Sequence, residues 1–557
     1  MMRAPFCHRS WRVALRAAPM AAVAGLLVGA SAPQAQSSAA PAGAPPGAVP
    51  RADAAQAAPK DVPFVLREIR LPRTVAVPED EVFGVVAVYL RHAVGSPELS
   101  AIAAGIRQLY DRRGLSLVNI GLTVQDLNSG SLEVAVVEPR IARIEIATGS
   151  QPPISEARAR EVLENLDLRD GVPLNLNRLD RAMFTLNDWP GVSARATLAP
   201  AGDEGAFNLL LAVEPGPGLS GSIDFDNHGT VSSGRHRLGG LLRWNNPLGI
   251  GDNLDVRALV SDAQRVTVAR VAYEAPLGAT PWRAGAGYSR VTYELGGNFA
   301  VLGAVGSADV VDVSLSYPLI RAREHNLTSR VALETKRLED RFDAFAIRSD
   351  KRIDGAQFAL AFEARDRFWG GGYTGGQFGL QVGRLRIDTA DVRANDAALG
   401  ERATQGSFSK FSLQVNRLQA ITGNFAGYVG LAGQWASKNL DNAEKLTLGG
   451  AKGVRSYPGG EAPVDEGVIV NSELRWWIDA NWTVFTFYDW AHGTLQKRPN
   501  PALDNTRILR GAGLGLQFTK PDLINVKASL GWRGQEPVLS ESGNDRTRFL
   551  IQAQRSF

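Results

Sequence analysis

Hydrophobic and polar positions alternate with a period of two through most of the chain after residue 218. The stretch 525–533 illustrates the pattern, because every second side chain in it is apolar and would point to one face of an extended strand. Its apolar positions are Val526, Ala528, Leu530 and Trp532. The stretches 411–416 and 425–435 alternate in the same way. This pattern predicts a region of β-strands that each have one apolar and one polar face.

The number and spacing of these strands indicate how they assemble. About sixteen strands fit into the region, where short turns such as 246–252 alternate with longer loops such as 386–405. An outer-membrane barrel has this arrangement, and a soluble β-sandwich or propeller is the alternative that also alternates. The strand number favours a closed antiparallel barrel of sixteen strands with a water-filled lumen. The last strand, 548–557, ends on the aromatic residue Phe557, which we interpret as an insertion signal for the barrel assembly machinery.

Residues 64–215 show a different pattern, in which segments of helical spacing alternate with strands. One strand, two helices and two strands follow one another in 64–138, and the second helix stops at Gly114. The same order of elements repeats in 139–215, where Ser155 is the predicted N-cap of the first helix. The order predicts two copies of one small α+β domain, at 64–138 and 139–215, ahead of a barrel domain at 216–557.

The first 35 residues have the composition of a secretory signal peptide. A basic region precedes the apolar run 20–30, which is too short to span a bilayer as a helix. Small residues then offer cleavage after Ala32 or Ala35. Residues 36–63 are rich in Ala and Pro and predict a linker. The single cysteine, Cys7, lies in the leader, which excludes a disulfide framework or a cysteine-based metal site in the mature chain.

Composition and motifs argue against several classes of function. The formal net charge of only +4 does not indicate a nucleic-acid-binding protein. No nucleophile elbow, zinc-binding HExxH, P-loop or CxxC pair occurs, so we predict no enzyme, no metal and no cofactor. The run 511–516, GAGLGL, resembles part of a dinucleotide motif but lies in an alternating strand. His492 near Asp489 could suggest acid–base chemistry, although a lumen or turn histidine is the simpler interpretation.

The stretch 453–467, GVRSYPGGEAPVDEG, interrupts this strand-rich region with glycine, proline and charge. Local rules predict a loop between two strands, and by those rules alone a mobile surface connection is the simplest interpretation. Its lone arginine, Arg455, has no explanation in that interpretation.

Several segments in order resemble the two-partner-secretion transporters, the TpsB family that includes the ShlB, FhaC and HecB proteins. Residues 109–146, with QDL followed by SG, resemble the end of the first POTRA domain of that family, and 176–205 resemble the second. The segment 221–254, with DNHG, GRHR and NPLGIGD, resembles the first barrel strands. The resemblance covers nearly all of the chain after the leader. It implies two periplasmic POTRA domains followed by a sixteen-stranded barrel in the outer membrane.

The resemblance also gives the loop a role. In the superfamily the sixth extracellular loop folds into the lumen, which places the lumen loop here at 450–466. Its tip motif, VRGY or VRGF, corresponds to Val454, Arg455, Ser456 and Tyr457, and Glu461 falls in the segment that follows the tip. The partner motif on the barrel wall, F-x-D-x-G, corresponds to Phe487 and Asp489. An arginine fork can donate two hydrogen bonds to one carboxylate and so fix the position of a long loop.

Three departures from the family pattern stand out. Ser456 and Ala491 occupy positions where the family has glycine, and a Cβ at Ser456 restricts the backbone there. The family often has a helix of about 20 residues before the first POTRA domain that plugs the barrel. Residues 37–60 contain five prolines, so the sequence does not predict such a helix.

The implied function is a pore that binds an unfolded exoprotein through its POTRA domains and moves it to the cell surface without ATP. The implied partners are a large β-helical adhesin or haemolysin and the lipid of the outer membrane, and we expect a monomer. An assembly factor that inserts other barrels and a passive solute porin remain as alternatives. Two POTRA domains and the QDL and SG pattern favour the secretion pore.

Overall fold

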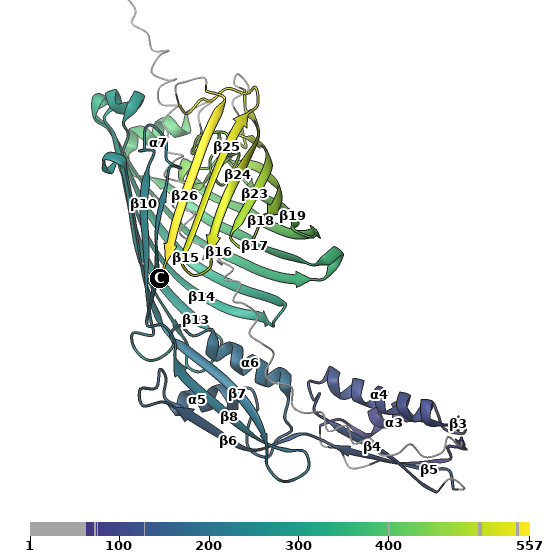
Figure 1. The fold of residues 1–557 in the computed structure, drawn as a ribbon. Coiled ribbons are helices and arrows are strands. Elements are labelled where there is room, and N and C mark those ends of the chain that lie inside the picture. Colours follow the sequence, from purple (N-terminus) through teal and green to yellow (C-terminus); the bar gives the residue numbers. More distant parts are fainter. Residues whose placement is uncertain are drawn as a thin grey trace, which may run out of the picture.

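The computed structural model describes residues 63–71, 74, 76–126, 129–398, 402–499, 504–541 and 545–557. Two helix-containing modules precede one large barrel, and Figure 1 shows both modules on the same side of it. The predicted signal peptide and almost all of the predicted linker lie outside the described residues. The predicted domain boundaries stay predictions.

The first module packs two helices against a three-stranded sheet of order β2-β5-β4. Its core is formed by apolar helix positions three or four residues apart, such as Ile102, Ile106 and the fully buried Tyr110. The first strand predicted in 64–138 is two short strands in the structure, because β1 pairs with β3 instead of joining the sheet. The elements are β1 (Phe64–Val65), β2 (Glu68–Arg70), α3 (Glu79–Ala87), β3 (Ala93–Val94), α4 (Ser96–Arg112), β4 (Asn119–Asp126) and β5 (Ser131–Val137).

The second module has the same design, with sheet order β6-β8-β7 and a separate core. Ser155 accepts a hydrogen bond from the backbone of Arg158 and so caps the first helix, as predicted. Asn175 caps the second helix in the same way. The elements are β6 (Arg140–Thr148), α5 (Glu156–Glu164), α6 (Leu176–Asn187), β7 (Val192–Pro200) and β8 (Ala206–Pro215).

The barrel consists of sixteen antiparallel strands in a closed sheet, which confirms the predicted fold class. Its strands are β9 (Leu219–Asp226), β10 (Arg237–Asn245), β11 (Asn253–Ser261), β12 (Val266–Pro276), β13 (Arg283–Glu294), β14 (Ala304–Arg321), β15 (His325–Phe342), β16 (Ile347–Asp366), β17 (Gly372–Ile387), β18 (Gly406–Thr422), β19 (Phe425–Ala436), β22 (Glu466–Trp477), β23 (Trp482–Thr494), β24 (Thr506–Lys520), β25 (Ile524–Arg533) and β26 (Thr547–Ser556). Short turns face the modules, and the longer connections lie at the opposite end.

Among the described residues, helical turns occur in five barrel connections besides the one between β19 and β22. The loop 388–405 contains α7 (Ala390–Ala397), which the sequence analysis left as irregular loop. The 3-10 turns outside the lumen loop are η1 (Asp262–Gln264), η2 (Gly297–Leu302), η3 (Asp343–Phe345) and η4 (Phe368–Gly370). In the described residues no helix is both long enough and apolar enough to cross a membrane.

The barrel closes where the last strand pairs with the first, and this seam is short. Five residue pairs join β26 to β9, from Gln552 with Asp226 to Ser556 with Ser222, whereas eighteen join β15 to β16. Phe557 extends the seam through two backbone hydrogen bonds with Gly221. Its ring lies close to the Gly221 Cα, where a Cβ would be 2.7 Å from it.

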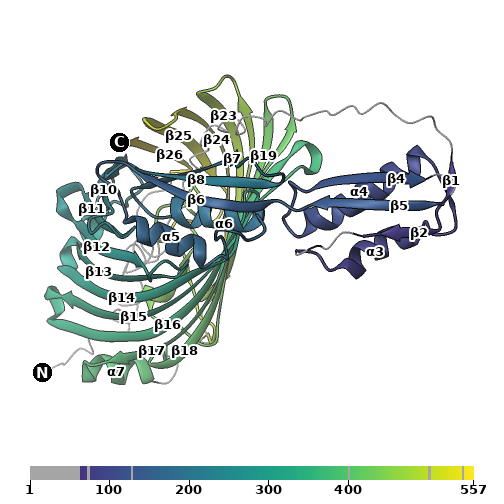
Figure 2. The same cartoon turned by 90° about the horizontal axis from the view of Figure 1, so that it is seen from below.

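The second module lies directly beneath the barrel opening, as Figure 2 shows from below. Arg321, at the end of β14, donates two hydrogen bonds to Asp188 at 2.7 and 2.8 Å and stacks on Phe184. The turn 246–252 approaches the module so closely that a Cβ at Gly251 would lie 2.7 Å from the Trp189 ring. These contacts hold the module across the mouth of the lumen.

Candidate functional site in the barrel lumen

The connection between β19 and β22, residues 437–465, folds back into the barrel, and we call it the lumen loop. It begins thirteen residues before the predicted start at 450, because 437–449 also lies inside the barrel. It contains η5 (Asn442–Glu444) and the short paired strands β20 (Leu446–Thr447) and β21 (Pro463–Val464). Most of its side chains are buried. The loop therefore packs as part of the interior rather than as a surface connection.

Arg455 lies at the loop tip and contacts Asp489 on β23. Its Nε and Nη2 donate to the two carboxylate oxygens at 2.9 and 2.7 Å, and its backbone N–H donates to Oδ2 at 3.0 Å. Asn471, the cross-strand neighbour of Asp489, donates to the same carboxylate at 2.8 Å and to the Gly453 carbonyl at 2.9 Å. The structure thus brings together the two residues that the family resemblance paired.

A second acid, Glu473 on β22, completes the site. Arg455 Nη1 donates to Glu473 Oε1 at 2.5 Å, and Glu473 is also within 2.7 Å of Arg475 and 3.5 Å of Lys527. Burial would lower the pKa of the Arg455 guanidinium, but its contacts with Asp489 and Glu473 raise that pKa above its ordinary value. The guanidinium is therefore charged, and Arg455 contacts both buried carboxylates, while Arg475 and Lys527 lie near Glu473 alone.

Sequence reasoning missed Glu473, although a signal for it exists. Glu473 is two residues from Asn471 on the same strand, so period-two alternation places both on the lumen face. The pattern identifies an inward acid on β22. It does not say which loop residue meets it.

Aromatic rings and glycines shape the wall beside the tip. The Arg455 guanidinium lies 3.8 Å from the centroid of the Phe487 ring, a cation–π contact. The Phe487 ring covers Gly513, where a Cβ would lie 2.3 Å from the ring. Phe485 covers Gly515 in the same way, at 2.2 Å. Glycine at these positions gives the rings room to lie flat against the wall.

Ser456 does not strain the backbone, although it stands where the family has glycine. Among the described residues outside glycine it is not one of those with positive φ, so an L side chain fits its conformation. Its hydroxyl is instead buried without a hydrogen-bond partner. It lies against Gly511, where a Cβ would be 1.9 Å from the Ser456 Oγ. The departure from glycine is therefore accommodated by a glycine on the facing strand.

The residues around Arg455 pack into an apolar cluster. Val454, Tyr457 and Ala491 are fully buried and contact Leu448 and Leu509. The Cβ of Ala491, where the family has glycine, thus becomes part of the packed wall. His492 has the opposite strand orientation and stacks with Trp490, so it does not face Asp489.

Beyond the tip, the loop is held by the connection 534–546. Tyr457 donates to the Glu536 carbonyl at 3.1 Å. The Glu461 carboxylate accepts from Arg507 at 2.9 Å, from the Ser540 hydroxyl at 2.6 Å and from the backbone N–H groups of Leu539 and Ser540. Glu461 therefore joins the lumen loop to β24 and to the connection between β25 and β26.

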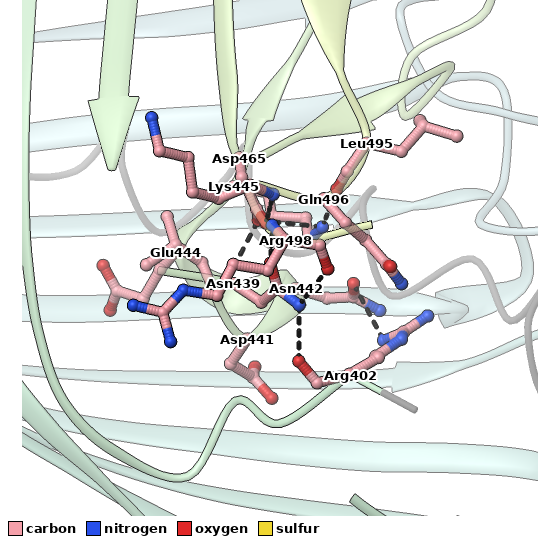
Figure 3. Close-up of polar contacts among 12 residues, drawn as sticks. Arg402, Asn439, Asp441, Asn442, Glu444, Lys445, Asp465, Leu495, Gln496 and Arg498 are labelled. Atoms are coloured by element: carbon pink, nitrogen blue, oxygen red, sulfur yellow. Dashed lines mark hydrogen bonds and ion pairs between the residues drawn. The ribbon is translucent and has the colours of Figure 1, made fainter. Parts of the chain in front are cut away.

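The base of the loop forms a polar cluster that the sequence analysis did not predict (Figure 3). Asn439 donates to the carbonyls of Arg402 and Arg498 at 2.6 and 3.0 Å and accepts from the Arg498 backbone at 2.6 Å. Asp465, fully buried, pairs with Lys445 at 2.9 Å and accepts from the backbone of Leu440 at 3.1 Å. The cluster ties the lumen loop to the β17–β18 connection through Arg402 and to the β23–β24 connection through Arg498.

Glu444, in η5 of the lumen loop, holds the base of the loop to the side of the barrel wall opposite the tip. Its carboxylate lies 2.8 Å from Lys336 on β15 and 2.8 Å from Lys410 on β18, and it accepts from Gln381 on β17 at 3.2 Å. Burial would raise the pKa of Glu444, but the two lysines hold it at about 2, so the carboxylate is charged at neutral pH. Arg455 thus holds the loop to β22 and β23, and Glu444 holds it to β15, β17 and β18 on the opposite side of the wall.

A cavity of about 760 Å³ lies between this anchor and the second module. Its wall is formed by β12–β19 and carries many polar side chains. They include Arg270, Asp312, Arg330, Gln357, Gln377, Gln414 and Gln434. Its floor includes Asp188 and Trp189 of the second module, and Leu446 of the lumen loop lies at its other end. The cavity extends from the module to the anchored loop, and its polar side chains lie among a larger apolar surface.

Glu444→Ala is expected to raise the ion conductance of the barrel severalfold in planar bilayers. The change removes the buried carboxylate that pairs with Lys410 and one of the two that pair with Lys336, which keeps Glu334 at 3.0 Å. Leaving Lys410 buried without its carboxylate costs about 3–5 kcal/mol and weakens the attachment of the loop base to this wall. Asp391→Ala, which removes an exposed acid from α7, is the control and should conduct as the parent does. Unchanged conductance of a correctly inserted Glu444→Ala barrel would show that this anchor does not hold the lumen closed.

Within the described residues, no group of three or more His, Cys, Asp or Glu side chains could hold a metal ion.

The chain matches two family descriptions. Residues 205–518 match "Haemolysin secretion/activation protein ShlB/FhaC/HecB", and residues 64–139 match "POTRA domain, ShlB-type". The heme/hemopexin transporter protein HuxB of Haemophilus influenzae is 25% identical over 489 residues, which is 86% of this chain and 84% of HuxB. The outer membrane transporter CdiB of Dickeya dadantii is 23% identical over 424 residues, 74% of this chain and 72% of CdiB.

Solved structures share the fold. CdiB from Escherichia coli superimposes with a TM-score of 0.70 at 20% identity, covering 90% of this chain and 92% of that one. CdiB from Acinetobacter baumannii gives 0.65 at 18% identity, covering 89% and 90%.

Proposed function

Because the chain belongs to the haemolysin secretion/activation family ShlB/FhaC/HecB, we propose that it carries an unfolded exoprotein past the lumen loop along the β12–β19 wall. It is an outer-membrane transporter of two-partner secretion with POTRA domains in the periplasm. The observation that supports this path is the cavity that opens from the second module, carries several glutamines on its wall and ends at the loop base. Glutamine amides along its wall can both donate and accept hydrogen bonds with an extended backbone.

In this proposal the POTRA domains receive the exoprotein. The two modules form separate three-stranded sheets, each with strands at its edges that can pair with an extended segment. The periplasm supplies no ATP, so folding of the exoprotein outside the cell gives the direction. The partner would be a large β-helical adhesin or haemolysin.

Arg455 and Asp489 hold the lumen loop in its working position in this proposal, and Phe487 supports the guanidinium from the wall. The site has no catalytic role, and the transporter acts as a monomer. Phe557 serves the barrel assembly machinery as the insertion signal during biogenesis. Neither a barrel-assembly factor nor a solute porin is favoured, because the family and both relatives named above are transport or secretion proteins.

Site-directed cross-linking tests the path. Period-two alternation on β18 places Gln414 in the lumen and its neighbour Val415 on the lipid face. Cysteine at Gln414 should cross-link to an exoprotein stalled in transit by a folded C-terminal fusion. Cysteine at Val415 is the matched control and should not, since the barrel wall separates it from the lumen.

The one natural cysteine, Cys7, lies in the predicted leader, so the engineered thiol would be the single thiol of the mature transporter. Equal cross-linking from both positions, or none from Gln414 while the stalled exoprotein occupies the barrel, would contradict a path along this wall.

A further inference from the structure

The outer face of β13–β17 carries a row of arginines toward the extracellular ends of the strands. Cross-strand partners follow one another from Arg290 to Asp309, then to Arg337, Arg352 and Arg386. Their sequence neighbours Lys336, Ile353 and Leu385 are buried on the lumen side, so the row itself faces outward. We call the four arginines of this line the arginine row.

The row places like charges directly opposite one another. Arg337 faces Arg352, and Arg352 faces Arg386, while one step further out Arg341 faces Arg348. Facing side chains on adjacent strands are about 5 Å apart, and like charges at that spacing destabilise a sheet. Carboxylates relieve part of the repulsion, as in the pairs of Arg352 with Asp354 at 2.9 Å and Arg348 with Asp350 at 3.0 Å.

The arginines remain available to solvent. The side chains of Arg290, Arg348 and Arg386 are 54%, 59% and 56% exposed. Arginines outnumber carboxylates among the side chains that point outward from the extracellular halves of β13–β17. The arginines are Arg290, Arg337, Arg341, Arg348, Arg352, Arg384 and Arg386, and the carboxylates are Glu294, Asp309, Glu339, Asp350 and Asp354.

An apolar surface follows immediately on the same faces of the same strands. Its exposed residues are Val311, Val313, Val331, Leu333, Phe358, Phe378, Leu380 and Val382. These positions meet the acyl chains of the bilayer, so the arginines lie at its extracellular boundary. A ligand of this surface would have acyl chains and, next to them, several negative charges.

We propose that the arginine row binds the phosphate groups of a phosphorylated glycolipid in the outer leaflet. Adjacent guanidinium groups can both donate to one phosphate, which turns the unfavourable facing of arginines into a favourable arrangement. A free phosphate would gain only the charge contacts, whereas a glycolipid also uses the apolar positions beneath them. The surface therefore selects an anionic amphiphile.

The test uses the full-length transporter in a neutral detergent with a bisphosphorylated acyl-disaccharide as the probe, read out by native mass spectrometry and thermal unfolding. The parent should bind the probe and unfold at a higher temperature in its presence. The variant R337Q/R352Q/R386Q should bind it about tenfold more weakly. Without the probe, the variant should unfold at the same or a higher temperature, because the facing arginines are gone.

The matched control R107Q/R143Q/R169Q removes three exposed arginines from the periplasmic modules and should bind the probe as the parent does. A dephosphorylated probe and inorganic pyrophosphate should each bind far more weakly than the bisphosphorylated lipid. Equal binding of the lipid by the parent and R337Q/R352Q/R386Q would overturn the proposal. Equal affinity of the parent for pyrophosphate and lipid would overturn it as well, in favour of a simple phosphate site.

Discussion

Arg455→Ala is expected to reduce export of the exoprotein by about tenfold or more while the barrel still inserts and remains heat-modifiable on a gel. The substitution leaves Asp489 and Glu473 buried without the cation that contacts both, which costs about 3–5 kcal/mol. The loop tip loses the bidentate contact that fixes its position. The barrel strands keep their backbone hydrogen bonds, so insertion should survive.

Lys452→Ala is the matched control for this experiment. Lys452 is a cation three residues away in the same loop, exposed, and without a hydrogen bond or ion pair in the described structure. Export by this variant should equal that of the parent. Normal export by Arg455→Ala would rule out the tip contact as a requirement for secretion.

Deletion of residues 64–138 is expected to stop export and leave ion conductance intact. The two modules have separate cores, and few hydrogen bonds join them, among them Leu176 N–H to Gly114 O at 2.7 Å and Asn175 to Arg113 O at 2.7 Å. The second module should therefore still fold and dock beneath the barrel. The deletion would remove only the sheet of the first module, which we propose binds the exoprotein.

Conductance and heat-modifiability measured on the same preparation separate this result from failed insertion. A deletion variant that conducts but does not export supports a receiving role for the first module. Normal export without 64–138 would assign reception of the exoprotein to the second module alone.

Much of the fold follows from local pattern. Period-two alternation predicted the barrel strands, and the repeated order of helices and strands predicted both modules. The pairing of Arg455 with Asp489 did not come from alternation, which says only that Asp489 faces inward. It came from the family resemblance, because nothing local in either segment specifies a contact across 34 residues.

The rest of the site could not be predicted for the same physical reason. Glu444 meets Lys336 across 108 residues, and each is an ordinary polar position within its own segment. Ser456 stands where the family has glycine, which predicts a more restricted backbone at that position. The structure shows an ordinary backbone at Ser456. Gly511 on β24 leaves room for the Ser456 side chain. No pattern within the loop indicates this glycine.

The short seam between β26 and β9 bears on how the barrel forms. Its five pairs join residues more than three hundred positions apart, so no part of this contact can exist until the last strand has been made. Until then the sheet has two open edges whose backbone groups are unpaired and prone to join other strands. Closing so long a chain costs entropy, and only a few residue pairs offset that cost at the seam. Loss of the terminal residues, including Phe557, should therefore arrest the barrel as an open sheet.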